Sequence, residues 1–502
     1  MHRSSTLIIL LLICGCGAID AEQVPKTVET QKRMLSVESV PGQDAVELPV
    51  QNFELIAAND SNSEPPPADG DRPTFFDGIR QMIGENPAFE DGEVSSGLIE
   101  SLERAEDTFK EIRQSNREAI RGMNRQLRVG NAKTTPHIVL VTIPQLRFDH
   151  LPEMSRLSGV LRSGKIFTNY YAPSDNLQAA RWSLLTGQMA SQIPADHSIA
   201  AARSLPEVMW QSGYETALLG GWGSRQHPVE LGFDHWTGFP TVNGAVDRYP
   251  EFFFTQATKA RIVKQDSAHR LTSLDLLAHE VESFLTRHAQ SSRQFFLQVT
   301  LPYLNGMAED ENIKLVDGAV GHLVDTLNES GLSGKVCLII AGETGNHSQE
   351  PQTVHGQQFT ASSAGLHEGN LHTPCIVFWG LTAERGSVSD FPCSAIDLFP
   401  TLCDICMSHS GPKNFTGVSL LKAIRGEEMQ VERLLYWRLA DGGQAARRGR
   451  WKVILPRGEK ALRLYDLETD PAETEDVSQQ HPEVMQSFIA KPESNQSETE
   501  PI

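Results

Sequence analysis

The stretch HIVLVTI, residues 137–143, decides the fold. Five of its seven residues are branched aliphatic, which is typical of a strand buried on both faces. Similar runs recur downstream, with stretches of helical periodicity between them. This alternation predicts an α/β fold, in which a central, mainly parallel sheet is flanked by helices. The further strand-like runs are 295–301, 336–342 and 375–380, and the helical stretches are 204–212, 271–287 and 313–330.

The segments outside this α/β pattern indicate how the 502 residues are organised. The runs RLLYWRLA, RWKVILP and LRLYDLE, all after residue 415, predict a small antiparallel subdomain. We therefore expect a signal segment at 1–16, a disordered tether at 17–75, a helical extension at 76–130, a large α/β domain at 131–414, a C-terminal subdomain at 415–488 and a disordered tail at 489–502.

An apolar stripe with alternating spacings of four and three residues, interrupted at Asn116, predicts the helix in the extension. Such a stripe indicates either a short coiled coil or a helix docked on its own domain. Its members are Leu98, Leu102, Ala105, Phe109, Ile112, Ala119 and Met123.

The charge and the N-terminus limit the partners and the location. A formal net charge of −20 argues against nucleic acid and anionic membrane surfaces as partners of the body. The apolar run 7–13 is too short to span a bilayer. It leads into Cys14-Gly15-Cys16, which resembles the lipobox of bacterial lipoproteins, although an ordinary secretory signal remains the alternative. The resemblance implies a lipid on Cys16 and a place in the bacterial cell envelope, periplasmic or attached to the outer membrane.

Five cysteines lie beyond the signal segment. Cys337 and Cys375 fall inside strand-like runs, so we expect buried thiols. Cys403 and Cys406 have CxxC spacing, but without a second such pair or a histidine pair they do not predict a zinc site. If the protein is exported, Cys393 is able to form a disulfide with Cys403 or Cys406, and the sequence does not decide between these pairings.

Eight segments, in order, carry a family resemblance across about 136–485. They are PHIVLVTIPQLRFDHL, GKIFTNYYAPSDNLQAARWSLLTGQ, LPEVMWQSGYETALLGGWG, LGFDHWTG, CLIIAGETGNH, HEGNLHTPCIVFWG, SAIDLFPTLCDIC and LRLYDLETDPAETEDVSQQHPEVM. Together they resemble the sulfatases, members of the alkaline-phosphatase-like superfamily. The resemblance implies a chemistry with three needs: an oxidised cysteine or serine as nucleophile, a divalent cation, usually calcium, and Lys and His groups around the sulfate.

The nucleophile is missing from the matching positions. The modified cysteine or serine of the family falls on Leu177, whose hydrocarbon side chain cannot become an aldehyde. The proline and serine that follow it in the family signature fall on Ala179 and Ala180. Arg181 is retained, and the resemblance implies that it stabilises the nucleophile.

The metal ligands are degenerate by the same matching. The first family aspartate falls on Pro144 and its neighbour on Gln145. The two ligands of the late strand fall on Glu343 and Thr344, of which only Glu343 is a carboxylate.

The groups that contact the sulfate are also lost. The lysine and histidine of the family fall on Gly221 and Gly223, and a later lysine falls near Ser363. The histidine expected after the 295–301 run falls near 303–305. Because these groups act together, we predict a catalytically inactive sulfatase-fold protein without a cofactor; the alternative is a diverged sulfuric ester hydrolase that uses calcium.

Two further hypotheses concern the rim of the crevice at the strand ends. Arg147, Arg225, His227 and His372 are candidates for binding a sulfated polysaccharide, and another envelope protein is the alternative partner.

A hidden metallophosphatase is the other, less favoured hypothesis. Its nucleophile candidates are Ser174, Asp175 and Ser183, and its metal-ligand candidates are Asp149, His150, His347, Glu350 and His355.

Overall fold

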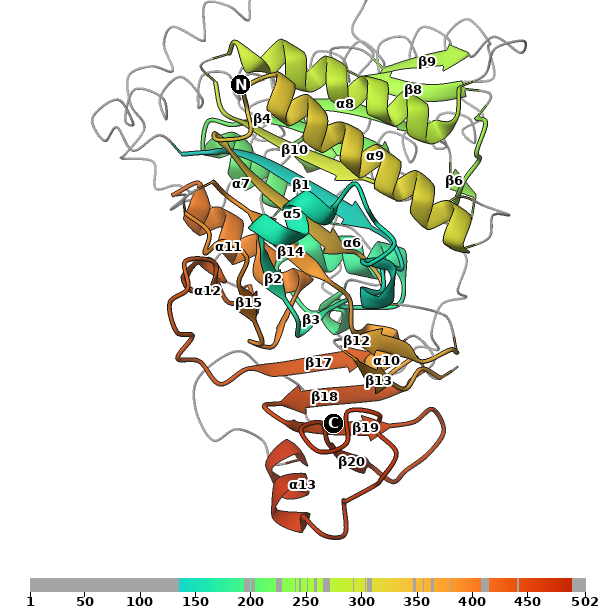
Figure 1. Cartoon of the computed structure of the whole chain (residues 1–502). Helices are drawn as coiled ribbons and strands as arrows, with labels where there is room; N and C mark the ends of the chain where they lie inside the picture. The colour runs from blue at the N-terminus through green and yellow to red at the C-terminus, as the bar shows by residue number, and fades with distance from the viewer. Residues whose placement is uncertain are drawn as a thin grey trace, which may run out of the picture. The chain divides into compact units, whose positions relative to one another are not determined.

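The structure is a computed structural model, shown in Figure 1. It describes residues 135–193, 199, 204–222, 228–239, 241–242, 245–250, 252–256, 260–264, 271–291, 293–302, 304, 309–345, 349–354, 356–362, 365–380, 382–407, 415–439 and 442–489. The signal segment, tether and helical extension lie outside the described residues, and so do Cys16 and the tail beyond Ile489. Among the described helices, none is long and apolar enough to cross a membrane.

A ten-stranded sheet forms the centre of the described chain, in the order β15-β2-β14-β11-β1-β10-β4-β5-β8-β9. The five strands from β11 to β5 run parallel, whereas β14, β8 and β9 introduce antiparallel pairs. The strands are β1 (His137–Ile143), β2 (Lys165–Phe167), β4 (Glu215–Gly221), β5 (His235–Phe239), β8 (Phe252–Gln256), β9 (Ala260–Lys264), β10 (Phe295–Thr300), β11 (Val336–Gly342), β14 (Cys375–Phe378) and β15 (Val388–Ser389).

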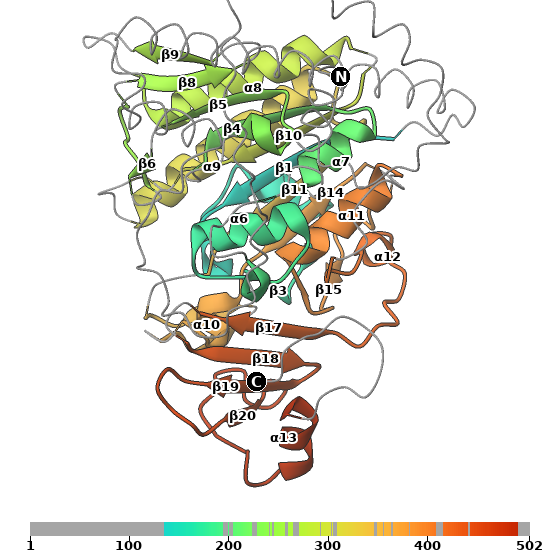
Figure 2. The same cartoon turned by 180° about the vertical axis from the view of Figure 1, so that it is seen from behind.

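Helices cover both faces of this sheet. One face carries α5 (Ser158–Ser163), α8 (Ser273–Ala289) and α9 (Glu309–Glu329), in front of the sheet in Figure 1. The other face carries α6 (Leu177–Thr186), α7 (Leu205–Gln211) and α11 (Leu398–Ile405), which Figure 2 brings forward. Each face has its own apolar core, and β1 contributes alternate side chains to both, which explains its unbroken apolar run.

Local signals in the sequence explain where the long helices begin. Thr272 caps α8: its hydroxyl accepts a hydrogen bond from the backbone N–H of Asp275, whose carboxylate accepts one from the N–H of Thr272 in return. Acidic residues occupy the first turn of α9, where their negative charges interact favourably with the positive end of the helix dipole. Shorter elements are α10 (Glu368–Leu371), α12 (Leu421–Ile424), and the strand pairs β3 (Tyr170–Tyr171) with β16 (Cys393–Ser394), β6 (Thr241–Val242) with β7 (Ala245–Val246), and β12 (Gln352–Val354) with β13 (Gln357–Phe359).

A four-stranded antiparallel sheet follows the main sheet, and it ends in the helix α13 (Pro482–Ile489). Its strands are β17 (Leu434–Arg438), β18 (Gln444–Arg448), β19 (Trp451–Leu455) and β20 (Arg463–Asp466). Figure 1 places this sheet beside α10, β12 and β13, and Figure 2 shows α10 beside it from behind. The architecture therefore confirms the predicted α/β fold with a C-terminal antiparallel sheet.

A buried charge network joins that sheet to α10 and β3. The Lys452 ammonium on β19 lies 2.8 Å from a carboxylate oxygen of Glu368 and 2.8 Å from one of Glu473. The hydroxyl of Tyr171 donates to Glu368, and the backbone N–H of Glu368 donates to the Glu473 carboxylate. Burial raises the pKa of Glu473 to about 7, and the neighbouring Glu368 acts in the same direction. The network makes the junction dependent on a small set of fully buried ions.

The cysteines are all buried and reduced in the described chain. This confirms the burial predicted for Cys337 and Cys375, and it gives no support to a disulfide from Cys393 to Cys403 or Cys406. Burial raises the pKa of the Cys337, Cys375, Cys393 and Cys403 thiols well above the ordinary range, so they are poor nucleophiles.

Candidate functional site

The carboxyl ends of β1 and β11 meet at one edge of the sheet. Ile143 pairs with Gly342, so the residues that follow lie side by side. The backbone N–H of Gln145 donates to the Thr344 hydroxyl at 3.1 Å. Gln145 has a φ of 56°, a left-handed conformation that a non-glycine residue rarely adopts. The structure thus brings together the positions predicted to be degenerate metal ligands, and it does so through a tight turn.

The start of α6 lies at the same edge, because the backbone N–H of Gly345 donates to the carbonyl of Ser174 at 3.1 Å. Asn176 caps the helix by accepting a hydrogen bond from the backbone N–H of Ala179 at 3.0 Å. Leu177 is the first residue of the helix and is half-buried. Arg181 follows one turn later and points back toward the strand ends. The backbone therefore presents a hydrocarbon side chain at the position predicted to correspond to the nucleophile.

Arg181 and Glu343 form a buried bidentate ion pair. Nε donates to one carboxylate oxygen at 2.7 Å and Nη2 to the other at 3.2 Å. The side chains are 5% and 1% exposed. The guanidinium carbon also lies 5.9 Å from the centre of the Trp222 ring at the end of β4. Glu343 is the only acidic residue among the four predicted metal positions. Arg181 thus holds both of its carboxylate oxygens.

These residues do not fit a calcium ion. Calcium takes six to eight oxygen ligands, and carboxylates are its main anionic donors. Pro144 offers no side-chain oxygen, Thr344 already accepts from Gln145, and Glu343 is held by Arg181. Within the described ranges, no group of three or more His, Cys, Asp and Glu side chains is placed to hold a metal ion.

Two of the four predicted rim residues are described, and neither is an exposed cation. Arg147 is 7% exposed and forms two hydrogen bonds, at 2.8 and 2.5 Å, with the carboxylate of Asp149. His372 is 2% exposed and stacks on Tyr171, with ring centres 4.9 Å apart. The structure corrects the rim placement of His372, because Phe148 and Phe359 also enclose its ring.

Several predicted positions fall in gaps between the described ranges. Gly221 is described at the end of β4 and has no side chain to contact a ligand. The remaining positions, outside the described residues, are Gly223, Arg225, His227 and Ser363, together with His347 and His355 of the phosphatase hypothesis.

Most of the described phosphatase candidates have structural partners, whereas the buried Ser183 hydroxyl has no hydrogen-bond partner in the structure. The Ser174 hydroxyl accepts a hydrogen bond from the backbone N–H of Asn176, and Ser183 is fully buried in α6. His150 accepts from the backbone N–H of Arg147 through Nδ1, and its Nε2 lies 3.0 Å from Glu309. Glu350 is exposed. These positions form a framework rather than a metal cluster.

The pairing of Arg181 with Glu343 and the Lys452 network were not predicted from the sequence. The first had a signal: two matched site positions, far apart in the chain, carry opposite charges while their neighbours are uncharged. The second had none, because Lys452 lies in a short strand with no recognisable pattern around it.

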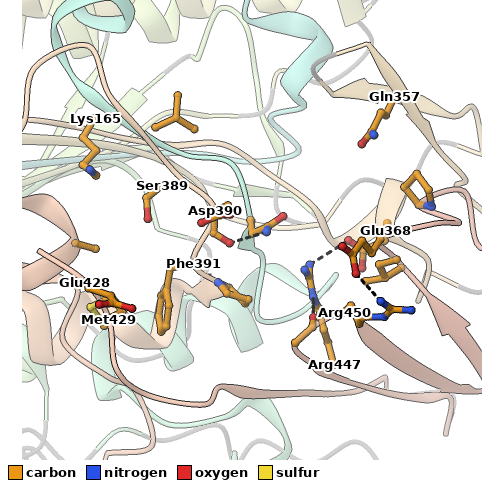
Figure 3. Close-up of a pocket in the computed structure, with 18 of the residues that line it drawn as sticks. Lys165, Gln357, Glu368, Ser389, Asp390, Phe391, Glu428, Met429, Arg447 and Arg450 are labelled. Carbon is orange, nitrogen blue, oxygen red and sulfur yellow. Dashed lines mark hydrogen bonds and ion pairs between the residues drawn. The ribbon is translucent and has the colours of Figure 1, made fainter. Parts of the chain in front are cut away.

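A further pocket among the described residues lies elsewhere. It has a volume of about 880 Å³ and runs between the β2–β15 edge and the C-terminal sheet. Figure 3 shows Phe391, Glu428 and Met429 on one side and Gln357 and Glu368 on the other. Arg181 and Glu343 do not line it.

The cations of this pocket are already paired. Lys165 lies 2.6 Å from Glu384, Arg447 lies 3.6 Å from Glu368, and Arg450 pairs with Asp466 and Glu468. Exposed Asp390, Glu427 and Glu428 add negative charge. A polyanion therefore gains little from this pocket.

Comparisons with known proteins agree with this fold. Residues 136–302 match the family model described as sulfatase. The N-acetylgalactosamine-6-sulfatase of Canis lupus familiaris is 22% identical over 383 residues, covering 65% of this chain and 73% of the relative. Arylsulfatase G of Rattus norvegicus is 21% identical over 443 residues, covering 69% and 84%. The solved structure of Ps i-CgsB in complex with k-i-k-neocarrahexaose superposes with a TM-score of 0.60 at 19% identity, covering 71% of this chain and 91% of that one.

Proposed function

The chain is a sulfatase-family protein, and we propose that it is a catalytically inactive member that works by binding, as a scaffold anchored in the bacterial cell envelope. The ion pair between Arg181 and Glu343 carries this proposal. A sulfate ester is cleaved when a nucleophile attacks sulfur while positive charge stabilises the oxygens. Here Leu177 offers no nucleophile, and the retained guanidinium is already engaged by an internal carboxylate.

The same pair supports the absence of a calcium cofactor. A cation at the strand ends has to displace Arg181 from Glu343, and it then finds one carboxylate where several are needed. Separating a buried pair leaves an uncompensated charge, which costs about 3–5 kcal/mol. Calcium binding is therefore opposed by the fold itself.

The charges favour a protein partner over a sulfated polysaccharide. Arg147 and Arg181 are both paired internally, and the net charge of the chain is −20. A sulfated glycan binds through unpaired cations, of which Arg225 and His227 are the remaining candidates. An assembly partner in the envelope requires no such cations. The proposed anchor is the lipid on Cys16.

Two binding measurements test the proposal. Calcium titration by calorimetry on the purified protein should give no heat of binding, whereas saturable micromolar binding would contradict the inactive assignment. Retention on a sulfated-glycan column should equal that of Arg225→Ala/His227→Ala. Stronger retention of the wild type would transfer the binding role to sulfated glycans. The alternative is a diverged sulfuric ester hydrolase, and a measurement of aryl sulfate hydrolysis decides whether it holds.

A further inference from the structure

An apolar groove lies between α5 and α9, beside the first residues of β11. Its volume is about 250 Å³. Val160, Leu327, Val336 and Leu338 are buried at its floor, and half-buried Phe378 lines it as well. The groove is open at Gly159, where an added Cβ would meet no atom within 4 Å. This volume accommodates a few apolar side chains.

The two helices that flank the groove are fixed to each other. The Asp317 carboxylate on α9 accepts hydrogen bonds from the backbone N–H groups of Arg156 and Leu157, both at 3.0 Å, just before α5 begins. An exposed ion pair between Arg156 and Asp325 also joins the two sides. The groove is therefore a preformed feature of the described fold.

The chain enters the sheet next to this groove. His137, the first residue of β1, pairs in register with Val336, which lines the groove. The segment with the predicted apolar stripe, Leu98 to Met123, ends fourteen residues before His137. Fourteen residues reach up to about 45–50 Å when extended, so the connection allows the segment to fold back on the groove.

The apolar periodicity points to the same segment. Its stripe residues recur mostly at spacings of four and three, so a helix formed there presents them on one face. That face matches the apolar lining of the groove, whereas Arg117 and Arg121 lie on the polar side of the helix.

We propose that the amphipathic segment 98–123 of the same chain docks in the groove between α5 and α9, with its apolar stripe toward Val160 and Leu327. The groove then serves as an intramolecular docking surface that joins the body to the N-terminal extension and, through it, to the tether. This inference is independent of catalytic status.

Hydrogen–deuterium exchange on the full chain tests the docking. In the wild type, amides of 98–123 should exchange at least about tenfold more slowly than in the isolated peptide. Gly159→Phe fills the groove from its open side and should remove that protection. Gly318→Phe is the matched control: it is also a helical glycine with no atom within 4 Å of an added Cβ, but it does not line the groove.

A second pair of variants changes residues of the segment 98–123 instead of the groove. Ile112→Asp places a charge on the stripe and should release the segment, whereas Gln114→Asp, on the polar side, should not. Thermal melts of all variants confirm that the body is folded. The proposal is overturned by an unprotected wild-type segment, by protection that survives Gly159→Phe, or by protection that disappears on dilution, because the last result assigns the segment to a second copy.

Discussion

Arg181 lies in the first half of α6, and Glu343 directly follows β11. Two hydrogen bonds of 2.7 and 3.2 Å join their side chains. Each is 5% exposed or less. Removing one partner should therefore be costly. Arg181→Met should lower the free energy of unfolding by about 3–5 kcal/mol, measured by urea denaturation.

The double variant Arg181→Met/Glu343→Leu is the matched control, because it removes both charges. It should recover most of the lost stability. If the single variant Arg181→Met is as stable as the wild type, the ion pair between Arg181 and Glu343 does not stabilise the fold.

The Lys452 network gives a second stability prediction. Lys452→Met leaves the carboxylates of Glu368 and Glu473 buried without their shared cation. We expect a loss of about 3–5 kcal/mol in unfolding free energy, whereas Lys460→Met, at an exposed position, should change it by less than about 0.5 kcal/mol. Equal effects for the two lysines would rule out a special role for the network.

The same network predicts a pH dependence of stability. The folded pKa of Glu473, about 7, lies above its ordinary value of 4.5 because of burial. The folded state therefore binds this proton more tightly, so its contribution is complete below pH 4.5 and is lost as the pH rises through about 7. Between about pH 5 and pH 8 the wild type should lose about 1–3 kcal/mol relative to Glu473→Gln, which carries no titrating group there. Parallel pH profiles of the two proteins would refute this assignment. Lys452, Glu368 and Arg447 are the charged groups around it, and all are buried.

The cysteines give a chemical test of the core. In a chain with Cys14 and Cys16 changed to serine, a thiol reagent should label none of the remaining five cysteines in the native state. All five should react after denaturation without reductant, because burial rather than a disulfide protects them. Three reactive thiols in the denatured chain would instead reveal one disulfide.

The anchor is tested separately from the fold. Cys16→Ser should move the protein from the membrane fraction to the soluble fraction and abolish incorporation of a labelled fatty acid. Cys14→Ser, two residues away, should change neither. A soluble wild type would leave the ordinary secretory signal as the explanation.

The parallel core of the sheet was predictable, because strands buried on both faces have distinctive runs. The runs 137–143 and 336–342 coincide with β1 and β11. The 375–380 run also forms a strand, β14, but it lies antiparallel to β11, and direction cannot be read from an apolar run alone. β18 was missed because QAARR has no apolar run; its alanines are buried only through pairing with β17 and β19.

The candidate site was predictable in composition but not in contacts. The sequence identified Leu177 and Pro144 as positions without functional groups. It did not indicate that Arg181 holds Glu343, since that contact depends on the direction of a side chain across 162 residues. The burial of His372 likewise follows from Tyr171 and two phenylalanines that are brought together only by the fold.

Hydrolysis of an aryl sulfate tests the central claim most directly. The purified wild type, assayed with calcium, should release the phenol no faster than Leu177→Ala, because neither protein has a nucleophile at that position. Release by the wild type that exceeds this blank severalfold, stops with a chelator and is lost in Arg181→Ala would show an active sulfuric ester hydrolase and contradict the account.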